Sequence, residues 1–201
     1  MKKAIEITMV IILLVSNVSC RKTLAKGEYV QYVKDKNNGL NKMVKVGPWD
    51  YCFQYKPHDY VILLEELTSL EKEKRGKELE GTAWFNISFH NRESAVSALR
   101  YELTSKDGYD KRLDYFLNHA VDDVKLIYGT SDTLLPIAYA FENNYSLTPQ
   151  ETIVVGFRLP IGEKAPTKDM QIVYDDKVYK SGIIKAKIAQ ESIENIPKIA
   201  L

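Results

Sequence analysis

Cysteine and histidine are scarce in this sequence, and their scarcity excludes several kinds of site. There are two cysteines and three histidines in 201 residues. No two histidines have the four-residue spacing of a helical metal site, and no cysteine pair can complete a structural zinc centre. His58 beside Asp59 has the composition of a base with its orienting carboxylate, but its position after Pro57 favours an exposed turn. We therefore predict no metal, no cofactor and no catalytic residue.

The chain also lacks an excess of charge and a long hydrophobic run. The formal net charge is +1, and the longest apolar stretch near the start, 7–15, has nine residues. A membrane-spanning helix needs roughly 20. A chain this close to neutrality has no overall field to gather nucleic acid or an anionic surface. The sequence also contains no glycine-rich phosphate loop, G-x-S-x-G elbow or dinucleotide fingerprint, which removes several common enzyme classes.

What is present begins with an export signal. Lys2 and Lys3 precede the apolar stretch, and small or polar residues follow it at 16–19, which is the layout of a secretory signal. The ending Val18-Ser19-Cys20 resembles a loose lipobox, the cleavage motif of bacterial lipoprotein precursors, although Asn17 stands where that motif usually carries an apolar residue. We predict that residues 1–19 are removed and that Cys20 is lipidated.

The resemblance implies a permanent membrane anchor. Cys20 would carry a thioether-linked diacylglycerol and an amide-linked fatty acid, and each buried methylene contributes about 0.8 kcal/mol. Arg21 follows, instead of the Asp that retains similar lipoproteins in the inner membrane, and no acidic cluster for surface export is present. By this analogy the protein lies in the cell envelope, at the outer membrane and facing the periplasm. Membrane lipid is then its first partner, with no role for nucleic acid.

After a tether at 20–27, residues 28–201 predict a single β-rich domain. Segments 28–34 and 42–46 flank Asn38-Gly39, which favours a hairpin. Strict alternation predicts strands at 49–56 and 82–90. Shorter strands are expected at 124–128, 135–142, 152–158, 170–174 and 182–188, separated by turn-forming residues. This spacing favours an antiparallel β-sandwich, most clearly from about residue 120 to 201.

One to three short helices are expected to interrupt these strands. Residues 60–64 predict a strand that gives way to a solvated helix ending near Gly81, with Glu71 opposite Arg75 and Glu73 opposite Lys77. Residues 92–103 fit a helix or a strand. A further helix is predicted after Asp107, with an apolar stripe formed by Tyr109, Leu113, Phe116 and Leu117. The fold class is therefore mainly β, at the margin of α+β.

Aromatic rings and paired carboxylates are the remaining candidates for function. Thirteen tyrosines and two tryptophans supply rings that can stack on sugars or peptides. The alternating rings at 49–55 are interpreted as core, which leaves Tyr60 and Trp84 as candidate exposed rings. Asp122-Asp123, Asp175-Asp176 and Ser131-Asp132 could supply acid and base for glycoside hydrolysis. Adjacent aspartates more commonly form turns, however. The lone Cys52, between Tyr51 and Phe53, is interpreted as a small apolar residue of a sheet.

A wider resemblance rests on five segments: GEYVQYVKDKNNGLNK, QYKPHDYVILLEE, LRYELTS, YAFENNYSLTPQETIVVGFRLP and GIIKAKI. Together they resemble a family of uncharacterised envelope lipoproteins of Gram-negative bacteria, over most of the mature chain. That family has no assigned reaction or ligand, so the resemblance implies export and lipidation and adds no site residue. We expect a non-enzymatic protein that docks other envelope proteins. The alternatives are a glycan-binding sandwich with exposed rings and a hydrolase with paired carboxylates.

Overall fold

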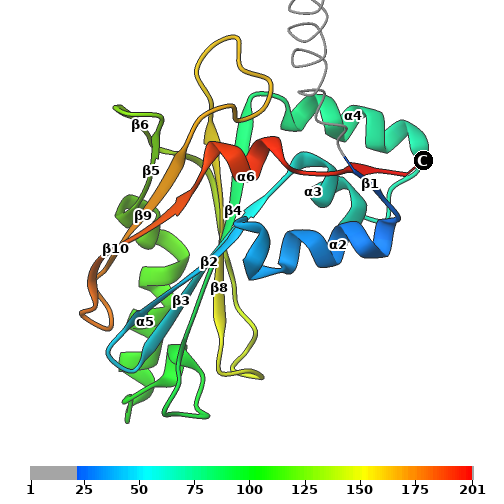
Figure 1. The fold of residues 1–201 in the computed structure, drawn as a ribbon. Helices are drawn as coiled ribbons and strands as arrows, with labels where there is room; N and C mark the ends of the chain where they lie inside the picture. Colours follow the sequence, from blue (N-terminus) through cyan, green and yellow to red (C-terminus); the bar gives the residue numbers. More distant parts are fainter. Residues whose placement is uncertain (1–21, 201) are drawn as a thin grey trace, which may run out of the picture.

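The computed structural model describes residues 22–200, which form two large antiparallel sheets and a short third one (Figure 1). The five-stranded sheet has the order β2 (Asn41–Val46), β3 (Trp49–Lys56), β4 (Thr82–Asn91), β8 (Glu151–Arg158), β7 (Pro136–Glu142). The four-stranded sheet has the order β10 (Gly182–Ile188), β9 (Met170–Asp176), β5 (Val124–Tyr128), β6 (Asp132–Leu134). A parallel pair joins β1 (Thr23–Leu24) to β11 (Lys198–Ile199). The predicted strands from residue 124 onward are thus present, within two residues at each end.

Helices are longer and more numerous than the sequence suggested. They are α2 (Lys26–Lys34), α3 (His58–Leu64), α4 (Ser69–Leu79), α5 (Lys106–Asn118) and α6 (Gln190–Glu194), with short 3₁₀ turns at 36–38, 98–100 and 120–123. Helix and strand take similar shares of the described chain, so the fold is α+β with antiparallel sheets. The expectation of a mainly β fold is wrong in this balance.

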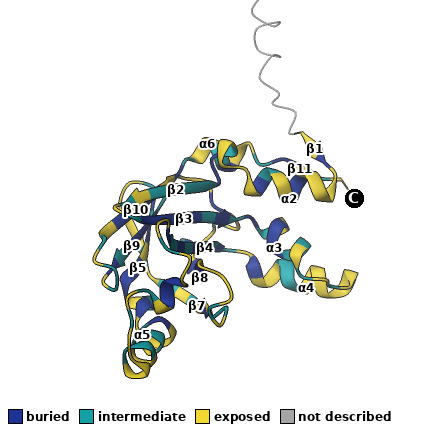
Figure 2. Cartoon of the chain, turned by 90° about the horizontal axis from the view of Figure 1, so that it is seen from below, coloured by how far each residue is buried: buried dark blue, intermediate teal, exposed yellow. Residues whose placement is uncertain are grey.

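The two large sheets share one core (Figure 2). Tyr51 and Phe89 of the five-stranded sheet pack near Tyr174 of the four-stranded sheet, with ring centroids 6.2 and 6.4 Å from that of Tyr174. Phe116 of α5 stacks on Phe89 and on Phe141 of β7, at 5.3 and 5.1 Å. The alternation predicted for 49–56 is confirmed, because its four odd-numbered rings are all buried. Aromatic rings from both sheets and from α5 therefore pack together within this core.

The predicted hairpin at 28–46 is wrong, because its first half is helix α2. Tyr29 and Val33, four residues apart, are both fully buried on one face of that helix. The Glu28 carboxylate accepts the Ala25 N–H at 3.0 Å, which satisfies a free donor of the first turn. Gly39 does adopt a left-handed conformation, with φ of 79°, but it ends a 3₁₀ turn that leads from the helix into β2.

The segment 60–64 is also helical, since α3 begins directly after Pro57. A second helix, α4, follows with Thr68 as its cap: the Glu71 carboxylate accepts the Thr68 N–H at 2.8 Å. The predicted pair of Glu73 and Lys77 is confirmed at 2.8 Å. Arg75 instead pairs with Glu65 at 2.9 Å, because Glu71 is engaged in the cap.

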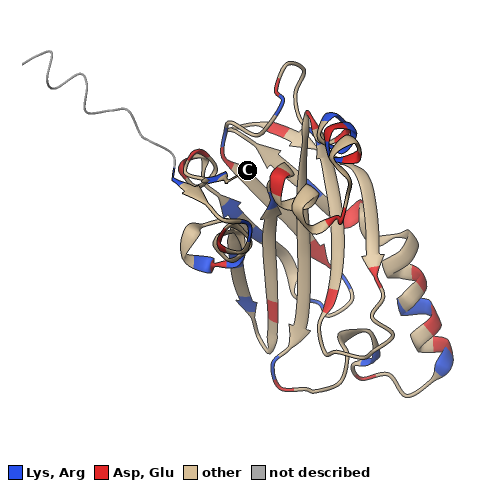
Figure 3. Cartoon of the chain, turned by 90° about the vertical axis from the view of Figure 1, so that its right-hand side faces the viewer, with Lys and Arg blue, Asp and Glu red and all other residues tan. Residues whose placement is uncertain are grey.

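Helix α5 begins two residues earlier than predicted, because Ser105 and not Asp107 is its cap. Its cap is Ser105, whose hydroxyl accepts the Gly108 N–H at 3.1 Å, and Asp107 lies in the first turn. Of the predicted apolar stripe, Phe116 is buried and Leu117 is 47% exposed. Acidic and basic residues alternate along the outer face of α5 (Figure 3). This helix therefore covers the core with one face and presents a charge-balanced surface to water.

The two ends of the described chain meet. The Lys198 N–H donates to the Lys22 carbonyl at 2.9 Å, and the Ala200 N–H donates to the Leu24 carbonyl at 2.8 Å. Ordered structure thus begins within the stretch expected to act as a tether, while residues 1–21 lie outside the described part. We call α2, α3, α4, β1 and β11 the terminal lobe, because they lie together on one side of the five-stranded sheet (Figure 1).

Candidate functional site

The sequence-predicted site residues do not come together. Cys20 lies outside the described residues. Tyr60 is 3% exposed, so the prediction of an exposed ring is wrong: it lies on the inward side of α3, and burial raises the pKa of its hydroxyl. Trp84 is half-buried on the sheet face opposite Phe85, and its Nε1–H donates to the Thr82 hydroxyl at 2.9 Å. Neither ring forms a stacking platform with the other.

His58 and Cys52 have structural partners. His58 Nε2 lies 2.9 Å from the Thr82 carbonyl oxygen, so the imidazole ties α3 to the start of β4. The Cys52 thiol donates to the Asn41 side-chain oxygen at 2.8 Å, and burial raises the pKa of that thiol. Among residues 22–200, no three His, Cys, Asp or Glu side chains gather as a metal site would require.

The paired aspartates serve the fold. Asp176 is buried and accepts the Tyr51 hydroxyl at 2.7 Å, together with the backbone N–H groups of residues 178, 179 and 181 at 3.0–3.1 Å. Asp123 accepts the Tyr115 hydroxyl and the Lys177 ammonium. Carboxylates engaged in this way organise the turns at the ends of β9 and β5, as expected for adjacent aspartates.

The β7 edge of the five-stranded sheet differs from the other edges of the two large sheets in length and in its lack of lysine. In Figure 2 the strands of this sheet run from β2 at the top to β7 at the bottom. The β2 edge carries Lys42 and Lys45 and lies against β10, while β10 carries Lys185 and Lys187. Lysines on an edge strand discourage pairing with another chain. The β6 edge has three residues, and β7, with seven, has no lysine.

Exposed apolar side chains lie along this edge. Leu135 is 69% exposed and Ile137 50% exposed, at an irregularity in the register between Pro136 and Ala138. The Tyr139 hydroxyl donates to the Phe116 carbonyl at 2.7 Å, which brings the end of α5, with the 47% exposed Leu117, next to β7. We call Leu117, Leu135, Ile137 and Ala140 the β7 surface. The sequence predicts this strand, but its edge position follows from the sheet order.

A second surface is a cleft of about 380 Å³ that the sequence did not reveal. It is lined by aromatic and charged side chains, among them Trp49, Tyr101, Tyr179, Arg112, Glu102 and Lys180. We call it the aromatic cleft. Glu102 and Lys180 have positive φ of 55° and 57°, a conformation that costs free energy for residues other than glycine and is common at functional sites.

The rings of the aromatic cleft pack on one another. Trp49 stacks on Tyr179 with 3.8 Å between centroids, and Tyr101 meets Trp49 at 85° with 5.2 Å between centroids. The Arg112 guanidinium donates to the Tyr101 carbonyl at 2.7 Å and lies 5.4 Å from the Tyr179 ring centroid. The cleft is thus an ordered aromatic and cationic surface, in which the rings largely cover one another's faces.

Comparisons with known proteins add little to this geometry. No protein-family model matches the chain, and no curated protein matches it. A solved structure from Burkholderia pseudomallei, described as a novel protein of unknown function, aligns with a TM-score of 0.38 and 13% sequence identity, over 87% of this chain and 94% of its own. No helix between residues 22 and 200 is both long and apolar enough to cross a membrane.

Proposed function

We propose that this protein is a lipid-anchored, non-enzymatic component of the bacterial envelope that docks another envelope protein by strand addition to the β7 surface. The membership of an uncharacterised Gram-negative lipoprotein family and the periplasm-facing location at the outer membrane belong to this proposal. The exposed, lysine-free edge of β7 carries it, since beyond Pro136 and the register irregularity at its start this edge is a template for an added strand.

The anchor is supported by the residues around Cys20. A basic start, a short apolar run and small residues before Cys20 are the ordered parts of a lipoprotein signal. The described fold begins with β1 at Thr23. An anchor on Cys20 would therefore be joined to the folded domain by a very short connection, which holds the domain at the bilayer surface.

The docking surface is supported by exposure and by backbone geometry. Outward-facing N–H and C=O groups of an edge strand offer hydrogen bonds, and apolar side chains beside them offer burial. Leu135 and Ile137 provide that apolar area at one end of β7. The occupant is thus an extended segment of another envelope protein, with alternating apolar side chains.

Site-specific photo-crosslinking in the intact envelope tests the docking surface. A crosslinking residue at Ile137 should give a discrete adduct, and Ala140→Lys should abolish it, because a lysine on the edge opposes strand addition. The same residue at Ile183, which is 65% exposed on the other sheet, serves as the matched control. Equal adducts at both positions, or an adduct at 137 that survives Ala140→Lys, would refute docking at β7.

Mass spectrometry tests the anchor separately. The amino terminus of the native protein should be Cys20 carrying three acyl chains, and Cys20→Ala should release the mature protein from the membrane fraction. An unmodified terminus would refute the anchor without bearing on the β7 surface.

Glycan binding is a second candidate, favoured by the aromatic cleft. Three rings meet there beside Arg112, together with Glu102 and Lys180, the two residues of positive φ. A bound saccharide would stack on the parts of Tyr101 and Tyr179 that remain half-exposed. A glycan array probed with the wild type and with Tyr101→Ala tests this candidate, and an array without hits rejects it.

A further inference from the structure

A groove in the terminal lobe combines an apolar floor with a basic rim. Its volume is about 490 Å³, and it lies where α2, α3, α4 and β11 converge. The apolar lining comes from Ile62, Leu63, Ile199 and Ala200, and the charged lining from Lys26, Lys72, Lys198 and Asp59. We call it the lysine groove.

The three lysines of the groove are exposed and have no carboxylate partner within the described residues. Other lysines of α4 differ, since Lys74 pairs with Glu78 and Lys77 with Glu73. With Asp59 as the acidic member of the lining, the groove keeps an excess of positive charge. Unpaired ammonium groups around an apolar floor match a ligand with an anionic head and an apolar body.

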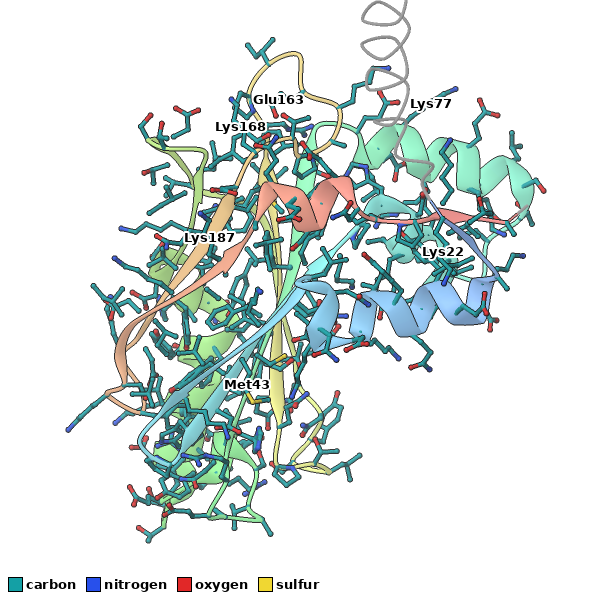
Figure 4. The ribbon with its side chains drawn as sticks, viewed as in Figure 1. Lys22, Met43, Lys77, Glu163, Lys168 and Lys187 are labelled. Atoms are coloured by element: carbon teal, nitrogen blue, oxygen red, sulfur yellow. The ribbon has the colours of Figure 1, made fainter. Side chains whose placement is uncertain are left out.

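The position of the groove in the chain suggests where such a ligand comes from. Lys198 and Ile199 belong to β11, which pairs with Thr23 and Leu24 of β1. Lys22, labelled in Figure 4, directly precedes β1 in the terminal lobe. Cys20 precedes Thr23 by three residues, and three extended residues reach at most about 11 Å. The proposed anchor would thus hold the groove wall at the headgroup layer of the bilayer.

From this convergence we infer that the lysine groove binds the headgroup of an anionic phospholipid in the membrane that carries the anchor. The inference rests on the proposed function for the presence of the membrane. It fixes the orientation of the domain, with the terminal lobe toward the bilayer and the β7 surface free for a protein partner.

Vesicle binding by the unlipidated domain tests the inference independently of the anchor. Residues 21–201 contain every described strand, helix and core residue, so this form retains the fold and lacks Cys20. We expect it to co-sediment with phosphatidylcholine vesicles that contain phosphatidylglycerol, and to bind pure phosphatidylcholine vesicles much more weakly.

A groove variant and a matched control separate the site from overall charge. Each lysine near an anionic surface strengthens binding about fivefold, so the variant Lys26→Gln, Lys72→Gln, Lys198→Gln should bind about 100-fold more weakly. The control replaces Lys45, Lys125 and Lys185, which are exposed lysines of the two large sheets, with glutamine. The net charge changes equally in the two variants, so a difference between them reports the site. The control should remain close to the wild type, because its three lysines lie outside the groove lining.

A gain of binding guards against a variant that simply unfolds. Asp59→Asn removes the acidic group from the groove lining and should strengthen binding to the anionic vesicles about fivefold. Equal loss in groove and control variants, no preference for phosphatidylglycerol, or no gain from Asp59→Asn would each overturn the inference. An unmodified Cys20 in the native protein would instead overturn the proposed anchor, while the vesicle result would stand.

Discussion

The indole of Trp84 lies flat over Gly156 of the neighbouring strand, so that a Cβ at position 156 would come within 3.0–3.1 Å of three ring atoms. A glycine inside a strand often marks such a close approach. The contact explains why Trp84, on the outer face of the sheet, is half-buried instead of exposed.

The first prediction follows from this contact. Gly156→Ala should lower the free energy of unfolding by about 1–3 kcal/mol, because the added methyl displaces the indole. Urea unfolding followed by tryptophan emission measures the change. Gly27→Ala is the control: nothing lies within 4 Å of its new Cβ in helix α2, and alanine there should stabilise by about 0.5–1 kcal/mol. Identical urea midpoints for Gly156→Ala and the wild type would contradict the packing.

The second prediction concerns the two adjacent aspartates at the end of β9. Asp176→Asn should destabilise by about 3 kcal/mol, because an amide nitrogen cannot accept the hydrogen bonds that the buried carboxylate receives from Tyr51 and the following backbone. Asp175→Asn, one residue earlier and less buried, should change stability by less than about 0.5 kcal/mol. Chemical denaturation of both variants gives the comparison, and similar losses at the two positions would argue against the network.

The third prediction is a dependence of stability on pH. Glu151 is fully buried at the start of β8, where it accepts the Ser97 hydroxyl, and burial raises the pKa of its carboxyl. The folded state therefore holds a proton that the unfolded state releases at lower pH. The contribution of Glu151 to the free energy of unfolding is fully present below the ordinary carboxyl pKa. It is lost as pH rises through the raised pKa of the folded state.

This dependence is measured as a difference between variants. Glu151→Gln should remove it, so the stability of the wild type relative to Glu151→Gln should fall as pH rises from about 4 and level off above the raised pKa. Urea titrations across that range measure both proteins. Glu142→Gln, at an exposed position of β7, is the control. A difference that stays constant with pH would show that the carboxyl does not titrate in this way.

The fourth prediction concerns the ion pair that fastens α4 to the segment after α3. Arg75 donates through Nε and a terminal nitrogen to both oxygens of Glu65, at 2.9–3.1 Å. Arg75→Lys keeps the charge but loses this two-point geometry, so it should cost about 0.5–1 kcal/mol. Lys77→Gln removes an exposed pair and should cost less. Thermal unfolding ranks the two, and a larger cost for Lys77→Gln would contradict the geometry.

Particular residues show why part of this fold could be predicted from sequence. The segment 49–56 alternates rings with polar residues over a full strand, a pattern that a helix cannot bury on one face. The strands from residue 124 onward are separated by turn-forming residues, which makes their ends predictable. In contrast, EYVQYVK places Tyr29 and Val33 four residues apart, and its apolar spacing fits both periods over so short a segment. Tertiary packing favours the helix, because Tyr29 and Val33 join the buried core and α2 contacts α3 and β11.

The candidate sites depended on information that the sequence does not contain. The sequence predicts an exposed Tyr60 because the β-branched run after Pro57 favours a strand. The segment is helix α3 instead, which turns the Tyr60 ring inward. The β7 surface requires the order of strands in the sheet. The lysine groove joins Lys26 to Lys198, residues at opposite ends of the described chain. Local patterns carry no signal for such distant neighbours.

The pairing of β1 with β11 has a practical consequence for engineering. Because the first and last described strands lie side by side, a short peptide suffices to bridge them, and the polypeptide can be reopened at a surface loop such as 143–150. A circularly permuted chain of this kind would carry its new ends beside β7, on the opposite end of that strand from Pro136. It would present a fused reporter to whatever approaches the sheet from that direction.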